Sequence, residues 1–136
     1  MSKRDIAMAF HSQGFNCAQS VFLAFCEDFG VSKDLAATLS LPFGGGMGQM
    51  RETCGALTGA FMVLGLANKQ NEAPTPQEKA LCYEKVRSLA ESFQAENSSM
   101  LCRELLALAQ ENNEKKNCHE LVGYTAELLE KFLKNN

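Results

Sequence analysis

The sequence lacks the features that mark several large classes of protein. No apolar run reaches the roughly 20 residues that a membrane-spanning helix needs, and the first residues, MSKRDIAMAFHSQG, hold no apolar stretch of signal-peptide length. The 13 lysines and arginines are scattered along the chain, and the net charge is −3. Nucleic-acid binding needs a clustered basic face, so this composition argues against it. We therefore expect a cytoplasmic protein whose main partner is neither a membrane nor a nucleic acid.

Signals for β-strands are missing as well. No segment alternates apolar and polar residues, and the chain holds only five Val, five Thr and one Ile. Helical periodicity and capping residues instead predict helices over residues 3–13, 17–29, 33–41, 54–67, 76–95, 100–110 and 118–133. A chain of 136 residues fits one domain with a real hydrophobic core. We expect a single all-α domain spanning residues 1–136, a helical bundle of five to seven helices around a buried central helix.

The predicted central helix follows a glycine-rich loop, GGGMGQMRET, at residues 44–53. No charged residue occurs between Cys54 and Leu66, so a helix here must be enclosed by the rest of the chain. Gly55 and Gly59 lie at helical spacing, and each costs roughly 1 kcal/mol relative to Ala inside a helix. Such a cost indicates that another backbone comes close. The loop lacks the Lys-Ser/Thr ending of a phosphate-binding loop, so we expect it to turn the chain tightly toward Cys54.

Six cysteines are present but no CxxC motif, which excludes a thioredoxin-type dithiol and a zinc ribbon. Without an export signal, these cysteines are not expected to form structural disulfides. Four of them fall at predicted helix starts: Cys17, Cys54, Cys102 and Cys118. The other two, Cys26 and Cys82, lie inside predicted helices on apolar faces, where we expect them to serve as packing residues.

The first turn of a helix favours negative charge, because its backbone N–H groups are unpaired and the helix dipole is positive there. We therefore expect the four thiols at helix starts to have a pKa below the ordinary value of about 8.5. On the same grounds, Cys54 is expected to react faster than Cys82 with an alkylating agent at pH 7. Arg51 and Arg103 lie close in sequence to two of these cysteines and would add to the effect.

The four cysteines are separated by 37, 48 and 16 residues, so only the fold can bring them together. Helix starts that meet at one end of a bundle crowd their positive ends, and thiolates or a ligand held by them would offset this. We expect the four to converge, with Cys54 beside Cys17. Cys118 is the hardest of the four to bring near Cys102. The chain normally reverses direction after the one helix between them, so that successive helix starts lie at opposite ends of a bundle.

The residues around Cys54 also match a known pattern. Cys54-Gly55-Ala56-Leu57-Thr58-Gly59 fits CGAxxG, with Asn16-Cys17-Ala18-Gln19 upstream and Cys102 and Cys118 downstream. With these residues the chain resembles, over nearly its whole length, the C_GCAxxG_C_C family, whose members are described as redox-active proteins. The resemblance implies a redox-active helical domain whose site residues are Cys17, Cys54, Cys102 and Cys118. Some relatives carry twin-arginine export signals and many look linked to transporters or oxidoreductases; no such signal occurs here, so export does not carry over.

Three functions remain open on these residues. In the first, two or more of the four cysteines cycle between dithiol and disulfide and exchange electrons with a partner oxidoreductase. In the second, the same four cysteines hold an iron–sulfur cluster or zinc. In the third, the chain is a non-catalytic helical module whose cysteines only pack. The sequence leaves open whether the protein is an enzyme, its substrate and its oligomeric state, and we expect His11 and His119 to be surface or capping residues.

Overall fold

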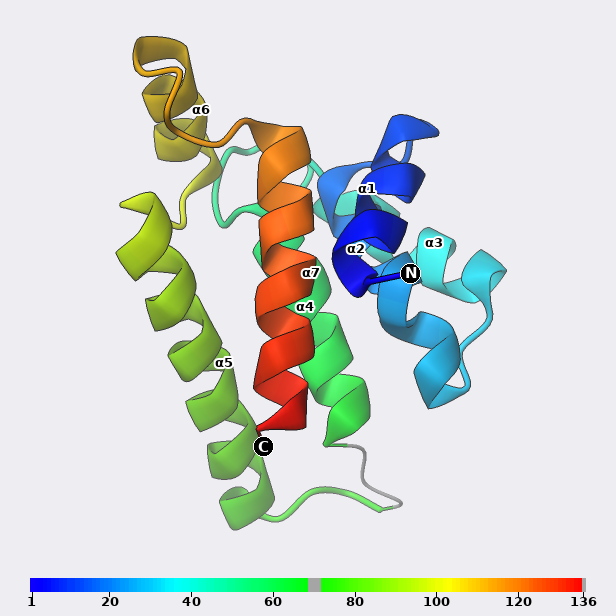
Figure 1. The fold of residues 1–136 in the computed structure, drawn as a ribbon. Helices are drawn as coiled ribbons and strands as arrows, with labels where there is room; N and C mark the ends of the chain where they lie inside the picture. The colour runs from blue at the N-terminus through cyan, green and yellow to red at the C-terminus, as the bar shows by residue number, and fades with distance from the viewer. Residues whose placement is uncertain (69–71, 136) are drawn as a thin grey trace.

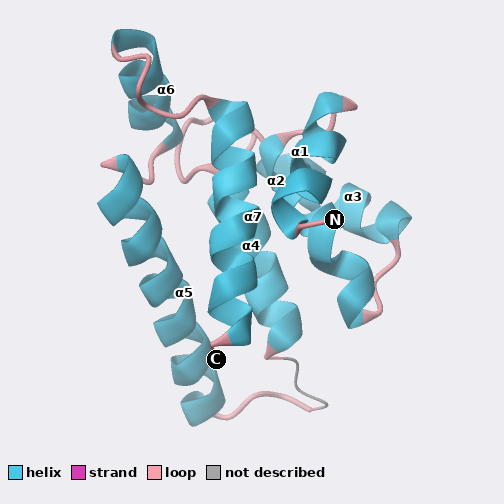
Figure 2. Cartoon of the chain, viewed as in Figure 1, coloured by secondary structure: helices cyan, strands magenta, loops and turns pink. Residues whose placement is uncertain are grey.

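The computed structural model describes residues 1–68 and 72–135 of the chain. Within these residues the chain forms seven α-helices, two short 3₁₀ helices and no strand. In order they are α1 (Lys3–Ser12), α2 (Cys17–Phe25), η1 (Cys26–Phe29), α3 (Lys33–Ser40), η2 (Leu41–Phe43), α4 (Gly55–Ala67), α5 (Pro76–Asn97), α6 (Cys102–Glu111) and α7 (Cys118–Lys134) (Figure 2). The predicted all-α class is confirmed. None of the described helices is long and apolar enough to cross a membrane.

Side-chain caps set most of the helix starts. Asn16, Thr75 and Asn117 each accept a hydrogen bond from the N–H group three residues ahead, and the side chain of that residue accepts one from the N–H of the cap. Ser2 and Ser32 cap α1 and α3 through their side-chain oxygens. The starts predicted at residues 3, 17, 33, 76 and 118 are therefore confirmed, because each depends on a local pattern that the sequence shows directly.

Each predicted helix differs from the structure by at least one residue at one end, and two of these differences have a clear structural cause. The helix predicted over residues 17–29 is α-helical only to Phe25 and continues as η1 until Gly30, whose φ of 77° ends it. The helix predicted from residue 100 begins at Cys102, because Leu101 forms an isolated antiparallel bridge with Thr53. A single bridge between residues so far apart leaves no periodic signal in the sequence.

The core is organised around the crossing of α2 and α4, which pack extensively against each other. A Cβ atom on Gly59 would lie 2.6 Å from the carbonyl oxygen of Ala18, and one on Gly55 would overlap the sulfur of Cys17. The close contact expected at the two glycines is therefore present. Only residues without a side chain allow the two helices to approach this far.

The prediction that the helix over residues 54–67 is the most buried is wrong. Every residue of α2 after its first is buried, whereas α4 reaches the surface at Gly65 and Ala67. The side chain of Gln19 is tolerated inside α2 because it donates a hydrogen bond of 2.9 Å to the carbonyl oxygen of Ala37. The apolar sequence of α4 showed that the helix is enclosed, but not that α2 lies deeper.

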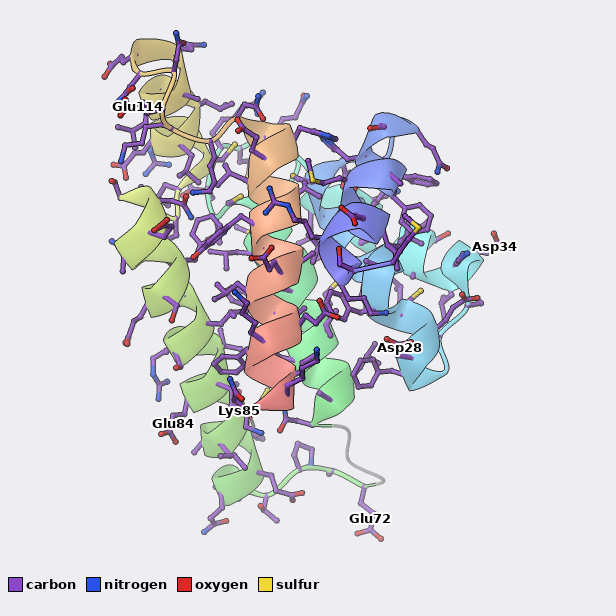
Figure 3. The ribbon with its side chains drawn as sticks, viewed as in Figure 1. Asp28, Asp34, Glu72, Glu84, Lys85 and Glu114 are labelled. Atoms are coloured by element: carbon purple, nitrogen blue, oxygen red, sulfur yellow. The ribbon has the colours of Figure 1, made fainter. Side chains whose placement is uncertain are left out.

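The remaining helices surround this pair. In Figure 1, α7 runs through the middle of the molecule in front of α4, with α5 on one side and α1, α2 and α3 on the other. Both α4 and α7 start at the upper end of that view, and α6 projects from the same end. The charged side chains labelled in Figure 3, among them Asp34, Glu84 and Glu114, lie on the outside of the bundle. The upper end is therefore where several helix starts meet.

Candidate functional site

The four cysteines singled out by the sequence stand at four helix starts. Cys17, Cys102 and Cys118 are the first residues of α2, α6 and α7, and Cys54 is the residue that caps α4. Cys54 and Cys102 are buried, with 7% of each residue exposed, while Cys17 is half-buried and Cys118 is exposed. All of them are free thiols. Their positions at helix starts are confirmed, and they span a range from buried to accessible.

The crossing of α2 and α4 brings Cys17 to Cys54. The sulfur of Cys17 lies against the Cα atom of Gly55, where any side chain would overlap it. Because Gly55 directly follows Cys54, the two thiols are neighbours, and negative charge on Cys17 raises the pKa of Cys54. The CGAxxG pattern thus has a physical basis in this chain. Its first glycine makes room for a sulfur, and its second, Gly59, makes room for a backbone carbonyl.

A second connection ties the start of α4 to the start of α6. Thr53 and Leu101 form an antiparallel bridge, across which the N–H groups of Cys54 and Cys102 each donate a hydrogen bond, at 2.9 and 2.6 Å. In such a ladder Cys54 and Cys102 are diagonal neighbours on the same face, for which separations of about 7–8 Å are usual. The bridge therefore directs both buried thiols toward one side.

The glycine-rich loop places a positively charged side chain beside one of the four cysteines. Arg51 donates a hydrogen bond from Nη1 to the sulfur of Cys102, at 3.6 Å. The tight turn expected of this loop is present, and the residues that make it have φ between 59° and 73°: Gly45, Gly46, Met47, Gly48, Gln49 and Arg51. Three of these are not glycines, and a left-handed conformation costs them roughly 1–2 kcal/mol each. The fold therefore holds strain at the point where Arg51 reaches Cys102.

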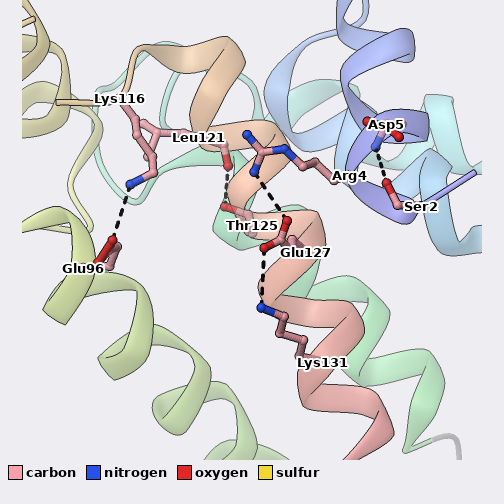
Figure 4. Close-up of polar contacts among 9 residues, drawn as sticks. All are labelled: Ser2, Arg4, Asp5, Glu96, Lys116, Leu121, Thr125, Glu127 and Lys131. Carbon is pink, nitrogen blue, oxygen red and sulfur yellow. Dashed lines mark hydrogen bonds and ion pairs between the residues drawn. The ribbon is translucent and has the colours of Figure 1, made fainter. Parts of the chain in front are cut away.

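The chain between Cys102 and Cys118 runs away from the bundle along α6 and then returns to it. The helix α6 has 10 residues and rises about 15 Å, a distance that the six residues after it can retrace, since they can span roughly 20 Å. The return is fixed on α5, where Lys116 donates to Asn97 at 3.2 Å and pairs with Glu96 at 3.8 Å (Figure 4). Both helix starts therefore lie on the same side.

All four cysteines line one cavity of about 220 Å³. The other residues that line it are His11, Asn16, Gly45, Arg51, Gly55, Leu105, Leu106, Ala109, Lys116, Asn117 and Leu121. None of the described lining residues is acidic, and leucine side chains from α6 and α7 form an apolar wall. Buried and accessible thiols from four helix starts therefore border one small cavity. The closer approach expected from the sequence, with pairs of Cα atoms within about 7 Å, stays a prediction.

The expectation that all four thiols would be acidic is wrong for two of them. The pKa of Cys54 is raised to about 12, mainly by burial and also by Cys17 and Cys118, while the amides of Ala56 and Leu57 oppose the rise. The effect of the helix start thus exists, but desolvation is larger. The Cys118 residue is exposed at the rim, yet surrounding protein removes enough water to raise its pKa. Cys17 and Cys102 raise the pKa of Cys118 as well, and Arg51 lowers it.

The metal alternative requires a different arrangement of the four thiols. Zinc and iron–sulfur sites need several thiolates directed at one centre, with Zn–S distances of about 2.3 Å. In the part of the chain that the structure describes, no group of three or more His, Cys, Asp or Glu is arranged to hold a metal ion. The four thiols share a cavity without sharing a centre, so the arrangement as it stands does not fit a metal or a cluster.

Cys82 and His11 differ from what the sequence predicted for them. Cys26 is fully buried in the core, as predicted, whereas Cys82 is only half-buried on α5. His11 is not a plain surface residue, because it lines the cysteine cavity and its Nδ1 lies 2.8 Å from Nδ1 of His119. The adjacency of His119 to Cys118 was the only sequence signal for this contact, since the two histidines are 108 residues apart.

Comparison with known proteins gave one result. The family model described as "Putative redox-active protein (C_GCAxxG_C_C)" matches residues 15–132, which includes all four cysteines that line the cavity. Neither the search of curated proteins nor the search of solved structures returned a match.

Proposed function

We propose that this chain, which belongs to the C_GCAxxG_C_C family of redox-active proteins, is a thiol–disulfide protein that exchanges electrons with a partner oxidoreductase. The observation that carries the proposal is the cavity in which Cys17, Cys54, Cys102 and Cys118 meet. A disulfide needs two thiols that can approach each other and one that a partner can reach. The shared cavity supports the first requirement, and the exposure of Cys118 supports the second. Exchange of this kind would suit a reducing compartment such as the cytoplasm.

Cys118 is the thiol through which a partner enters. It is the exposed member of the four, while Cys54 and Cys102 are buried along the same cavity. Its thiolate attacks one sulfur of a disulfide in the partner, the S–S bond of the partner breaks, and a mixed disulfide forms. The leaving sulfur departs as a thiolate and takes up a proton.

Cys17 resolves this mixed disulfide. It is the neighbour with the largest influence on Cys118 among the cysteines, and it is half-buried in the same cavity. Its thiolate attacks the sulfur of Cys118 and releases the second thiolate of the partner, which is also protonated. One disulfide has then formed in this chain and one has been reduced in the partner, with two electrons and two protons transferred.

Cys54 and Cys102 form the inner part of the site. Cys17 adjoins Cys54 as well as Cys118, so an oxidised Cys17 can exchange its bond inward as well as outward. Cys102 receives the hydrogen bond from Arg51, and a guanidinium stabilises a thiolate formed beside it more than a neutral thiol. These two buried thiols form the protected side of the site.

Oxidation followed by disulfide mapping tests the proposal. Reduced protein is treated with oxidised glutathione, the remaining thiols are alkylated, and the bonds are located by mass spectrometry. We expect a disulfide between Cys17 and Cys118. The Cys17→Ser variant should instead accumulate glutathione on Cys118, because the resolving thiol is missing.

The matched control is Cys82→Ser, which removes a half-buried thiol outside the cavity and should leave the Cys17–Cys118 bond in place. Parent protein in which these four thiols stay unpaired, while the protein remains folded, would overturn the proposal. That result would favour a helical module whose cysteines only pack.

A further inference from the structure

The helices α1 and α7 are joined by three contacts in register. Arg4, Met8 and His11 follow one another along α1, and they meet Glu127, Gly123 and His119 in descending order along α7. Arg4 forms an ion pair with Glu127 (Figure 4), and 3.6 Å separates its Nη1 from Oε2. A Cβ on Gly123 would lie 2.5 Å from the sulfur of Met8. This antiparallel register brings the end of α1 to the start of α7, where Cys118 stands.

The last of these contacts is unlike the other two. Nδ1 of His11 and Nδ1 of His119 are 2.8 Å apart, and the two rings lie 5.1 Å apart at an angle of 27°. One proton lies between the two Nδ1 atoms, so one histidine donates and the other accepts. His11 also lines the cysteine cavity. Because its Nδ1 is engaged with His119, Nε2 is the ring nitrogen left to face the thiols.

The surroundings of His11 favour its neutral form. Burial lowers the pKa of His11 below its ordinary value, and His119 lowers it further. The titratable and charged groups around it are Cys17 on α2, Cys118 and His119 on α7, and Cys54, Cys102, Arg51 and Lys116 elsewhere on the cavity. No described acidic residue lines this cavity to hold a proton on the ring. At neutral pH the imidazole therefore has a lone pair available to accept a proton.

We propose that His11 is the proton acceptor of the cysteine site, and that His119 is a positioning residue that holds it. In this arrangement Nδ1–H of His11 donates to Nδ1 of His119, which leaves the lone pair of Nε2 for the cavity. The proton of the attacking thiol moves to Nε2, through water in the cavity, and leaves a thiolate and an imidazolium. The imidazolium later returns the proton to the thiolate released from the partner. This inference rests on the proposed thiol chemistry.

The role of the pair follows from the thiols that it serves. Cys118 has a raised pKa, so only a small fraction of the Cys118 side chains would be ionised at neutral pH without a base. A nearby neutral histidine supplies the missing base, and general-base assistance typically accelerates a reaction 10²–10⁴-fold. His119 stabilises the imidazolium of His11 because an N–H donor becomes a stronger donor when its ring is charged.

The experiment measures removal of the thiol proton without any disulfide. Iodoacetamide is uncharged and reacts with thiolates, so the alkylation rate of Cys118 is followed from pH 5 to 9, with mass spectrometry to locate the label. In the parent we expect a rise through the depressed pKa of His11, then a plateau, then a second rise as the thiol ionises. In His11→Gln the first rise should vanish, with at least a tenfold loss of rate at pH 7.

Two substitutions of His119 distinguish a role in positioning His11 from a role in filling space. His119→Asn places an acceptor oxygen close to the position of Nδ1 and should retain the plateau, whereas His119→Phe keeps the ring without its nitrogens and should lose it. Arg4→Gln is the structural control, because it breaks another contact between α1 and α7 away from the cavity. It should keep the profile of the parent.

A His11→Gln protein with the rate and pH profile of the parent would overturn the inference, as would an equal loss in folded Arg4→Gln. Circular dichroism and the melting temperature establish that each variant is folded. The outcome is independent of disulfide mapping. A lost plateau without any Cys17–Cys118 bond would leave His11 as the proton acceptor and reject the exchange reaction.

Discussion

The sulfur of Cys17 fills the space in front of Gly55, so that one contact serves both the packing of α2 on α4 and the placement of two thiols. The same Cβ on residue 55 would also lie 3.1 Å from the carbonyl oxygen of Phe43 and 3.3 Å from the N–H nitrogen of Ala18. A side chain at this position would have to displace backbone as well as sulfur. The chemistry of the site and the stability of the core are therefore coupled at the start of α4.

The close approach at Gly59 predicts a large loss of stability when a side chain is added. In Gly59→Leu, the Cβ alone would lie 2.6 Å from the carbonyl oxygen of Ala18, which belongs to a buried helix and cannot move aside. Overpacking of this kind costs roughly 1–3 kcal/mol or more. Chemical denaturation measures the loss in free energy of unfolding.

The matched control is Gly65→Leu in the same helix, where a Cβ meets nothing within 4 Å. Leucine has a better helix propensity than glycine, so this variant should be as stable as the parent or more stable by several tenths of a kcal/mol. Equal destabilisation by both substitutions would show that the contact with Ala18 is not what limits residue 59.

Strain in the glycine-rich loop predicts a stabilising substitution. Gln49 is exposed and has a φ of 61°, a conformation that costs a residue with a side chain roughly 1–2 kcal/mol. Gln49→Gly removes that cost but adds conformational entropy to the unfolded chain. We expect a net gain of about 0.5–1 kcal/mol in the free energy of unfolding.

Gly30→Ala is the reverse test, because Gly30 has a φ of 77° and a Cβ added there would meet nothing. This variant should lose about 1 kcal/mol in the free energy of unfolding.

The raised pKa of Cys54 predicts a loss of stability in alkali. The folded protein keeps this thiol protonated up to about pH 12, whereas the unfolded chain ionises it near pH 8.5. Its contribution is complete below pH 8.5 and falls as pH rises toward 12, because only the unfolded state gives up the proton in that window. We expect Cys54→Ala to abolish about 2 kcal/mol of the decline between pH 8 and 10. The Cys82→Ala protein should decline like the parent, and a parent-like slope in Cys54→Ala would contradict the assignment.

The arrangement of the thiols predicts that metal is not what holds the site together. No described group of three or more ligand residues is directed at one centre. Protein purified without air should therefore be colourless and hold well under one zinc or iron per chain. A strong chelator should leave its melting temperature unchanged. A coloured protein, or one that melts earlier after chelation, would show that the cysteines rearrange around a metal.

Local patterns in the sequence predicted much of the fold and part of the site. The cap residues Asn16 and Asn117 set the starts of α2 and α7. Each is followed directly by a cysteine, which therefore lies in the first turn of its helix. The spacing of Gly55 and Gly59 indicated a close helix contact, which the structure contains. These features depend on residues within one turn of each other, so the sequence displays them directly.

Features that depend on distant residues could not be predicted in this way. The bridge between Thr53 and Leu101 and the contact between His11 and His119 each join segments that have no shared local pattern. The pKa of Cys54 was predicted in the wrong direction, because the amides at its helix start are visible in the sequence while its burial is set by the whole fold. Desolvation then outweighs the local effect.

The most direct measurement of the central claim is a redox titration of the thiols. The protein is equilibrated anaerobically in glutathione buffers of increasing oxidation, quenched with acid, and labelled with a maleimide reagent that increases the mass for each free thiol. Thiol exchange through Cys17 and Cys118 predicts a reversible two-electron transition in which these two thiols are lost together. Replacing either with serine should abolish it, and Cys82→Ser should not. Thiols that remain fully labelled across the titration, or that are lost singly and irreversibly, would contradict the claim.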